Sequence, residues 1–173
     1  MRTRPALTLA DVKKIAAAAE AEAIRHNWIV AIAIVDDGGH LLGFERMDGA
    51  TPANAQIAVE KARTAAVSRR PSGAWEQRVK DGRLAMLKMP VLPVQGGVPI
   101  KVDGECVGAV GVSGVQSHED EQIAQAGIDA VGAEAAHEAV GPRRCDDGVV
   151  AIAAIDGVAI QARIDEVVFG AAE

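Results

Sequence analysis

Aromatic residues are almost absent from this 173-residue sequence, where they make up 2% of the chain and include no tyrosine. Proteins that bind single-stranded nucleic acids stack the bases on aromatic side chains, so this class is not expected. The net charge of −6 points the same way, because nucleic acids and anionic membranes attract basic proteins. We therefore expect neither a nucleic acid nor a membrane as a partner.

Cysteine is also scarce, since only Cys106 and Cys145 are present. Two cysteines provide neither a disulfide framework nor a cysteine metal cluster. No apolar run reaches the roughly 18 residues that a membrane span needs. Charged residues interrupt the N-terminal region from Asp11 to Glu20, so no signal peptide is expected. Free thiols without an export signal predict a cytoplasmic protein.

The hydrophobic pattern predicts helices that alternate with hairpins. In chain order we expect a helix over 8–25, strands over 29–35 and 40–46, a helix from Pro52 to about Arg69, a short helix from Ser72 to Lys80, an irregular segment over 81–95, strands over 98–102 and 105–113, and a helix from Ser117 to about Glu138. This order predicts an α+β fold, in which an antiparallel sheet of two hairpins is flanked by helices.

Local signals support these boundaries. Thr8 followed by Asp11 is typical of a capping box at a helix start. Asp103-Gly104 is typical of a type I′ hairpin turn. Gly108 and Gly111 fall inside the strand that follows, where glycine indicates a bulge or a close approach of another backbone.

Residues 141–173 are predicted to be a C-terminal extension of a domain over 1–140. Apolar runs over Val149–Ile155 and Val158–Ile164 flank Asp156-Gly157, which predicts a third hairpin. A lone hairpin is marginally stable in water. We therefore expect this β-hairpin tail to dock on its own domain or to be swapped between subunits.

Basic residues form the first candidate ligand site. Arg46, Lys61 and Arg63 can hold a carboxylate or a haem propionate, because guanidinium groups bind carboxylates with two hydrogen bonds. The alternative is a solvated helix face paired with Glu60 and Glu76. Thr64 and Ser113 add hydroxyl groups to this candidate binding set.

The stretch Gly96-Gly97-Val98-Pro99 is the second candidate site. Adjacent glycines let a backbone approach a ligand, and the amides of Gly97 and Val98 can polarise an oxygen atom. The alternative is a turn that leads into a strand. No Walker lysine follows, and no Gly-x-Ser-x-Gly motif surrounds Ser113, so neither a P-loop nor a serine hydrolase is indicated.

The third group consists of residues that can transfer a proton or bind a metal. His40 and His118 can ligate iron or move a proton, and His118 is the candidate metal ligand. The acidic run Glu119-Asp120-Glu121 that follows His118 could complete a metal site, or it could simply stabilise the start of a helix. Glu45 and Glu119 join His40 as candidate general acids or bases. The alternative for both histidines is an ordinary surface position.

Six stretches, taken together, resemble one protein family. They are AIAIVDDGGHL over 31–41, FERMDGA over 44–50, AVEKARTAA over 58–66, GGVPI over 96–100, VDGECVGAVGVSG over 102–114 and DEQIAQAG over 120–127. The chain is similar to the GlcG/HbpS-like (DUF336, haem-degrading domain) family over about residues 7–136. The extension beyond about residue 140 is atypical of that family.

The resemblance implies a somewhat profilin-like α+β domain that forms homo-oligomers, built from dimers into hexamers or octamers. It implies haem or iron as a cofactor for some members, and for others an activity on small unsaturated acids. Our first hypothesis is therefore an oligomeric protein that binds haem or a small anionic acid. The alternative is a cofactor-independent enzyme of aromatic catabolism, either a hydrolytic deaminase of aminomuconate type or a tautomerase. A third hypothesis is a purely structural assembly protein.

Overall fold

A computed structural model describes residues 4–138, 149–151 and 161–163. The chain divides into two units, residues 1–132 and residues 133–173. Its elements are α1 (Leu9–Arg25), β1 (Ala31–Asp36), β2 (Leu41–Arg46), α2 (Pro52–Ser68), α3 (Gly73–Lys80), the 3-10 helix η1 (Leu84–Lys88), β3 (Gly97–Val102), β4 (Glu105–Ser113), α4 (Ser117–Glu138), β5 (Val149–Ala151) and β6 (Gln161–Arg163).

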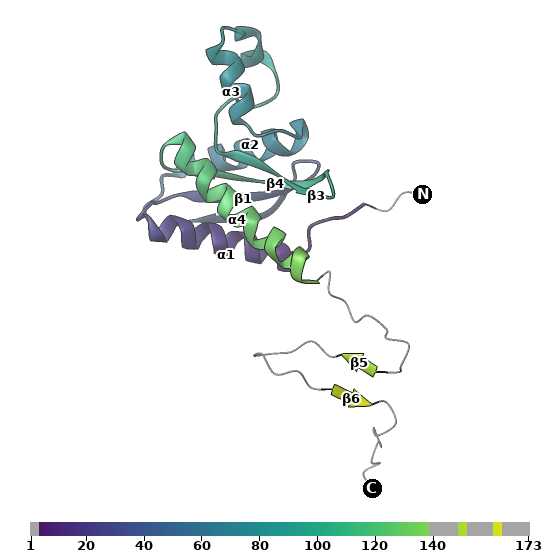
Figure 1. The fold of residues 1–173 in the computed structure, drawn as a ribbon. Coiled ribbons are helices and arrows are strands. Elements are labelled where there is room, and N and C mark those ends of the chain that lie inside the picture. The colour runs from purple at the N-terminus through teal and green to yellow at the C-terminus, as the bar shows by residue number, and fades with distance from the viewer. Residues whose placement is uncertain (1–3, 139–148, 152–160, 164–173) are drawn as a thin grey trace. The chain divides into compact units, whose positions relative to one another are not determined.

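Four strands of the first unit form an antiparallel sheet in the order β2-β1-β4-β3 (Figure 1). Ala31 pairs with Arg46 on one side and with Ser113 on the other, so these three residues form one row across the sheet. The strands β2 and β3 are the edges. This arrangement of helices and antiparallel hairpins confirms the predicted α+β fold class.

Helices cover both faces of the sheet. One core joins α1 and α4 to the sheet face that carries Ile32, Ile34 and Val110. The other core is made of small side chains, because alanines of α2 pack on Ala31, Ala33 and Ala109. A face of alanines lets a helix backbone lie very close to a sheet, and this closeness decides which residues fit beneath α2.

Gly111 shows how close this approach is. An added Cβ at Gly111 would overlap the Ala58 carbonyl oxygen of α2 and would lie 2.9 Å from the Cα of Ala62. The prediction that glycine in this strand indicates a close backbone approach is therefore confirmed. The turn at Asp103-Gly104 also follows its prediction, with positive φ at both residues (51° and 80°), as a type I′ turn requires.

The start of α1 is fixed by the predicted capping box. The backbone amide of Asp11 donates to Thr8 Oγ1 at 3.2 Å, and the backbone amide of Thr8 donates to Asp11 Oδ2 at 2.7 Å. The hydrogen bonds from Thr8 hold the pKa of Asp11 below its ordinary value. Each partner therefore satisfies a backbone donor that the helix itself leaves unpaired.

Replacing Thr8 by alanine is expected to lower the free energy of unfolding by about 1 kcal/mol, because one helix-terminal amide loses its acceptor. Urea unfolding followed by circular dichroism measures this change. Thr51→Ala is the matched control, since Thr51 is the N-cap residue of α2 but its side chain makes no capping hydrogen bond. Equal losses for the two variants would contradict the capping role of Thr8.

Two segments differ from the sequence-based expectation. Ser72 stands at the N-cap of α3, but its hydroxyl does not cap that helix. The segment 81–95, expected to be irregular, contains the 3-10 helix η1. Pro90 and Pro93, the residues that indicated irregular backbone, both follow η1 in the chain, so they do not prevent it from forming.

In the second unit, β5 and β6 pair as antiparallel strands, with Val149 opposite Arg163 and Ala151 opposite Gln161. This is the region of the predicted third hairpin, although its turn at Asp156-Gly157 lies outside the described residues. Among the helices of the described part, none combines the length and hydrophobicity that crossing a membrane would require.

Candidate functional site

A buried ion pair lies beneath α2. Lys61 Nζ of α2 lies 2.7 Å from Asp120 Oδ2 of α4 and donates to the Val112 carbonyl oxygen of β4 at 3.0 Å. Both charged side chains are only 2% exposed. The pair therefore ties α2, β4 and α4 together in a region from which water is excluded.

Asp120 occupies this position because it lies in the first turn of α4, directly after the end of β4. Its second oxygen, Oδ1, accepts a hydrogen bond from the Val115 amide at 3.2 Å. Burial raises the pKa of Asp120 above its ordinary value, although the hydrogen bond and the positive charge of Lys61 oppose that rise. From the sequence, Asp120 is interpreted as part of a helix start and of an acidic run that could bind a metal, and its pairing with Lys61 is not predicted.

The predicted glycine stretch packs against this ion pair. An added Cβ at Gly96, whose φ is +118°, would lie 2.8 Å from Lys61 Nζ. The Gly97 amide donates to Ser72 Oγ at 2.8 Å, and the Ser72 amide donates to the Gly97 carbonyl. Gly97 is thus engaged within the protein, and its amide is not directed at a ligand.

Further predicted residues surround the same region. Thr64 is buried, and its Oγ1 accepts a hydrogen bond from the Leu92 amide at 2.8 Å. Val98 and Pro99 are buried in β3, and Ser113 is buried at the end of β4. We define the buried polar cluster by its charged and hydroxyl side chains: Lys61, Thr64, Ser72, Ser113 and Asp120. Sequence reasoning missed Ser72 and Asp120, whose partners lie 25 and 59 residues away along the chain.

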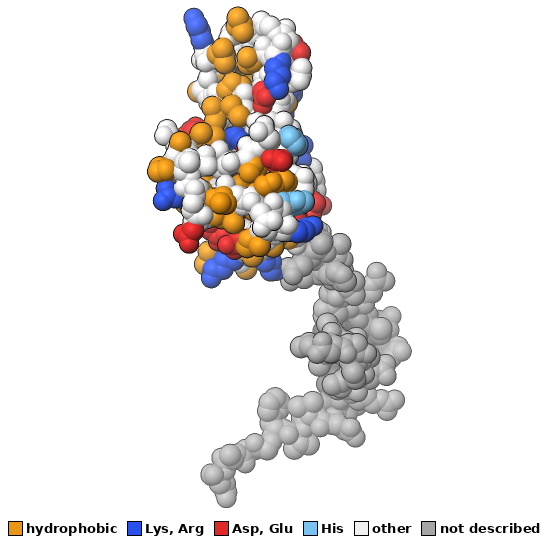
Figure 2. Space-filling view, turned by 90° about the vertical axis from the view of Figure 1, so that its left-hand side faces the viewer, with side chains coloured by type: hydrophobic (Ala, Val, Ile, Leu, Met, Phe, Trp, Pro, Cys, Tyr) orange, Lys and Arg blue, Asp and Glu red, His pale blue; other side chains and the backbone are white. Residues whose placement is uncertain are grey.

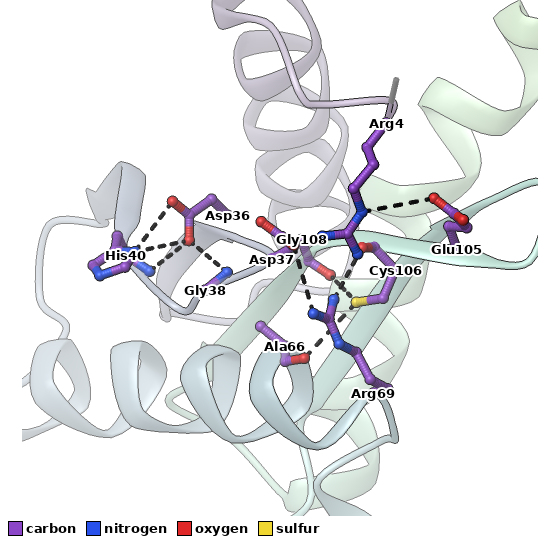
Figure 3. Close-up of polar contacts among 10 residues, drawn as sticks. All are labelled: Arg4, Asp36, Asp37, Gly38, His40, Ala66, Arg69, Glu105, Cys106 and Gly108. Carbon is purple, nitrogen blue, oxygen red and sulfur yellow. Dashed lines mark hydrogen bonds and ion pairs between the residues drawn. The ribbon is translucent and has the colours of Figure 1, made fainter. Parts of the chain in front are cut away.

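His40 lies at a different place, on the turn between β1 and β2 (Figure 3). Its side chain is 82% exposed, and Nδ1 lies 3.2 Å from Asp36 Oδ1. The same carboxylate accepts hydrogen bonds from the amides of Gly38 and His40. Burial acts to raise the pKa of Asp36, but these hydrogen bonds outweigh it and the pKa lies below its ordinary value. An ionised Asp36 therefore holds the imidazole in place.

Arg63 of α2 adjoins this turn. Its Nε donates to the Gly39 carbonyl oxygen at 3.3 Å, and its Nη1 lies 2.6 Å from Glu60 Oε1. Gly39 directly precedes His40, so the Arg63 guanidinium and the His40 imidazole both adjoin the β1–β2 turn. We define the turn surface as Asp36, His40, Leu41, Arg63 and Val67; Val67 and Arg63 both pack on Gly39.

The residues predicted to bind carboxylates (Arg46 and Arg63) and the predicted general acid or base Glu45 do not lie together in one site. Arg46 lies at the far end of β2 from the turn surface, about 17 Å from Leu41 at the usual rise per strand residue. Glu45 pairs with Ile32, whose side chain lies in the α1–α4 core, so Glu45 is on the opposite sheet face from Arg46. The structure therefore separates Arg46 from Arg63, and Glu45 from both.

His118 and Glu119 lie in the first turn of α4, where the acidic run suggested a metal site. Glu119 Oε2 accepts a hydrogen bond from the Gln116 amide at 2.9 Å, and Asp120 turns inward to Lys61. His118 is exposed. Across the part of the chain that the structure describes, no three His, Cys, Asp or Glu side chains gather in a way that could hold a metal ion.

An ionic network fixes the other side of the β1–β2 turn (Figure 3). Asp37 Oδ2 lies 3.5 Å from Arg4 and 3.5 Å from Arg69, which also donates to the carbonyl oxygen of Cys106 at 3.0 Å. This network connects the N-terminal segment, the end of α2 and β4. It holds the turn, and therefore His40, in a defined place.

Comparisons with known proteins agree with this architecture. The family model "Haem degrading protein HbpS-like" matches residues 7–129. Protein GlcG of Escherichia coli K12 is 48% identical over 114 residues, which cover 65% of this chain and 85% of GlcG. A double mutant of Streptomyces reticuli HbpS is 31% identical with a TM-score of 0.70, over 76% of this chain and 90% of that one.

A third related structure is described as a complex of PduOC with haem. It is 28% identical with a TM-score of 0.67, and the match covers 73% of this chain and 95% of PduOC. The family match spans well over half of the sequence and includes every element from α1 to the first part of α4. This chain therefore belongs to the HbpS-like family.

Proposed function

We propose that this protein binds haem at the turn surface, with His40 as the ligand of the iron. The observation that carries the proposal is the exposed imidazole whose Nδ1 faces the Asp36 carboxylate at 3.2 Å. A carboxylate on one ring nitrogen orients the ring and leaves the other nitrogen directed outward, as in many histidines that bind metals. Haem iron needs only such an axial ligand from the protein, because the porphyrin supplies the rest.

The neighbouring side chains fit the other parts of haem. The Arg63 guanidinium offers a cation to a propionate, and the Gly39 carbonyl holds its Nε in position. Leu41 and Val67 are exposed large hydrophobic residues that can contact the porphyrin. The related PduOC structure, described as a haem complex, supports the same ligand class.

A small anionic acid fits this geometry less well. Holding its carboxylates between two guanidinium groups would require Arg46 and Arg63 to lie close together, and they lie toward opposite ends of β2. Haem uses instead one imidazole and one cation that adjoin the same turn. When bound, haem would supply an iron centre that can bind a small ligand or carry an electron.

Titration of the purified full-length protein with haemin, followed in the Soret region, tests the proposal. We expect a saturable Soret shift for the wild type and at least roughly tenfold weaker binding for His40→Ala, because the iron loses its protein ligand. His118→Ala is the matched control, since His118 is also exposed but lies on α4. A wild type without a Soret shift, or a His40→Ala variant that binds like the wild type, would overturn the proposal.

A further inference from the structure

Ser113 of the buried polar cluster has a hydroxyl group without a partner. The residue ends β4 and is only 5% exposed, yet no group of the described residues forms a hydrogen bond with its Oγ. Ala31, which lies opposite Ser113 in the sheet, belongs to the core beneath α2, so the Ser113 side chain is on the α2 face. The large majority of buried polar side chains have a partner, so this hydroxyl points to a group that the chain itself does not supply.

Arg46 lies in the same row of the sheet, on the other side of Ala31. It ends β2 and pairs with Ala31, so its side chain is on the same face as that of Ser113. Opposite residues on neighbouring strands lie about 5 Å apart, so the long Arg46 side chain starts about 10 Å from Ser113. In the part of the chain that the structure describes, the Arg46 guanidinium forms no hydrogen bond or ion pair, not even with Asp48 in the loop that follows β2.

The direction of α2 brings its first turn to this row. Near the end of α2, the Ala66 carbonyl oxygen lies 3.9 Å from Cys106 Sγ. Further along β4, Gly111 lies against Ala58, which is closer to the start of α2. Residue numbers in α2 therefore fall as those in β4 rise, and Ser113, at the end of β4, lies beside the first turns of the helix.

The start of α2 is positively charged and has no anion of its own. The first backbone amides of a helix lack partners inside it, and together they act as roughly half a unit of positive charge. Thr51 is the N-cap residue, but its side chain makes no capping hydrogen bond, and the first turn contains no acidic residue. Asp120, the buried carboxylate nearby, is already paired with Lys61. The described contacts thus provide no carboxylate for the start of α2 or for Arg46.

We propose that Ser113, Arg46 and the first turn of α2 bind one small oxyanion, and we call this place the anion site. All three contribute donors, namely a hydroxyl, a guanidinium and backbone amides, and oxygen atoms of an anion accept from each of them. Figure 2 faces the end of the molecule where β1 begins, and uncharged side chains make up most of the surface there. This setting suits a ligand with one anionic group, and the carboxylate of a small acid and inorganic phosphate share that chemistry.

The anion site differs from the pair of guanidinium groups considered above. It needs a single guanidinium and does not include Arg63, so the separation of Arg46 from Arg63 is no obstacle. It also lies at the opposite end of β2 from the turn surface. The proposal therefore does not depend on haem binding at His40.

Titration of the full-length, haem-free protein with sodium phosphate, and separately with sodium acetate, tests the proposal. Two-dimensional NMR of the backbone amides follows binding at constant ionic strength, and we expect saturable shifts at Ser113 and in the first turn of α2. Arg46→Met should weaken binding at least roughly tenfold, because the anion loses its counter-charge. Ser113→Ala should weaken it roughly three- to tenfold, through the loss of one hydrogen bond. Arg46 is exposed, so its replacement should leave the fold intact, which the same spectra check.

Arg70→Met and Ser68→Ala are the matched controls, because both residues lie at the other end of α2 and should leave binding unchanged. Binding of phosphate, of acetate or of both supports the anion site and identifies the oxyanion that it takes. The proposal fails if neither anion shifts these amides, or if Arg46→Met binds as tightly as the wild type. Equal weakening by Arg70→Met would reveal a general attraction of anions to basic residues, which also contradicts a defined site.

Discussion

Replacing Lys61 by methionine is expected to lower the free energy of unfolding by about 3–5 kcal/mol, because it leaves the Asp120 carboxylate buried without its cation. Methionine preserves the length of the side chain, so the loss reflects the missing charge rather than a cavity. A single domain is stable by only about 5–15 kcal/mol, so such a loss is a large part of the total. Urea unfolding at pH 7 measures it.

The loss should depend on pH in a defined direction. Burial already raises the folded-state pKa of Asp120 above the ordinary value near 3.8, and the positive charge of Lys61 opposes that rise. Without Lys61 the pKa rises further, so folding of the variant favours the protonated carboxyl. The deficit is therefore greatest at neutral pH and shrinks as the pH falls through the raised pKa toward 3.8.

Two further variants separate the ion pair from other effects. Lys61→Met/Asp120→Leu removes both charges and should recover most of the stability, without the pH dependence of the single variant. Lys101→Met is the control for loss of a lysine charge, since Lys101 is exposed on β3. The structural role of Lys61 would be contradicted by a single variant as stable as the Lys101 control, or by a deficit that does not change with pH.

Local signals in the sequence were sufficient to predict most of the fold. The capping box at Thr8, the type I′ turn at Asp103-Gly104 and the glycine within β4 each act over a few residues or mark one close contact. Each of these features depends on the types of a few residues, so it can be recognised in the sequence. The order of helices and hairpins then leaves few arrangements that bury both faces of the sheet.

The candidate site was less predictable because it depends on distant residues. Lys61 has the residue type of an anion-binding group, but its partner Asp120 lies 59 positions away. Arg46 ends the hairpin of β1 and β2, and Arg63 lies in α2, the next helix along the chain. In the structure Arg63 contacts Gly39 at one end of β2, whereas Arg46 lies at the other end. Residue type therefore indicated which groups can carry charge, whereas long-range packing decided which of them remain available to a ligand.

Gly97→Ala is expected to destabilise the protein by at least about 3 kcal/mol. An added Cβ would overlap the Lys61 carbonyl oxygen and would lie 2.6 Å from the carbonyl carbon and 3.0 Å from Ser72 Oγ. The obstacle is the backbone of α2, which cannot rotate away as a flexible side chain can. Relief requires α2 to move off β3 and strains the ion pair between Lys61 and Asp120, so the loss should reach the upper end of the range for overpacked cores.

Gly132→Ala is the matched control for Gly97→Ala. Gly132 is exposed in α4, and an added Cβ there meets no atom within 4 Å. Alanine favours a helix over glycine by about 1 kcal/mol, so this variant should be slightly more stable than the wild type. The same substitution is thus expected to have opposite signs at two positions, as measured by urea unfolding. A Gly97→Ala variant that unfolds like the wild type would mean that α2 does not rest on Gly97, and that the buried polar cluster has room for a ligand beside Lys61.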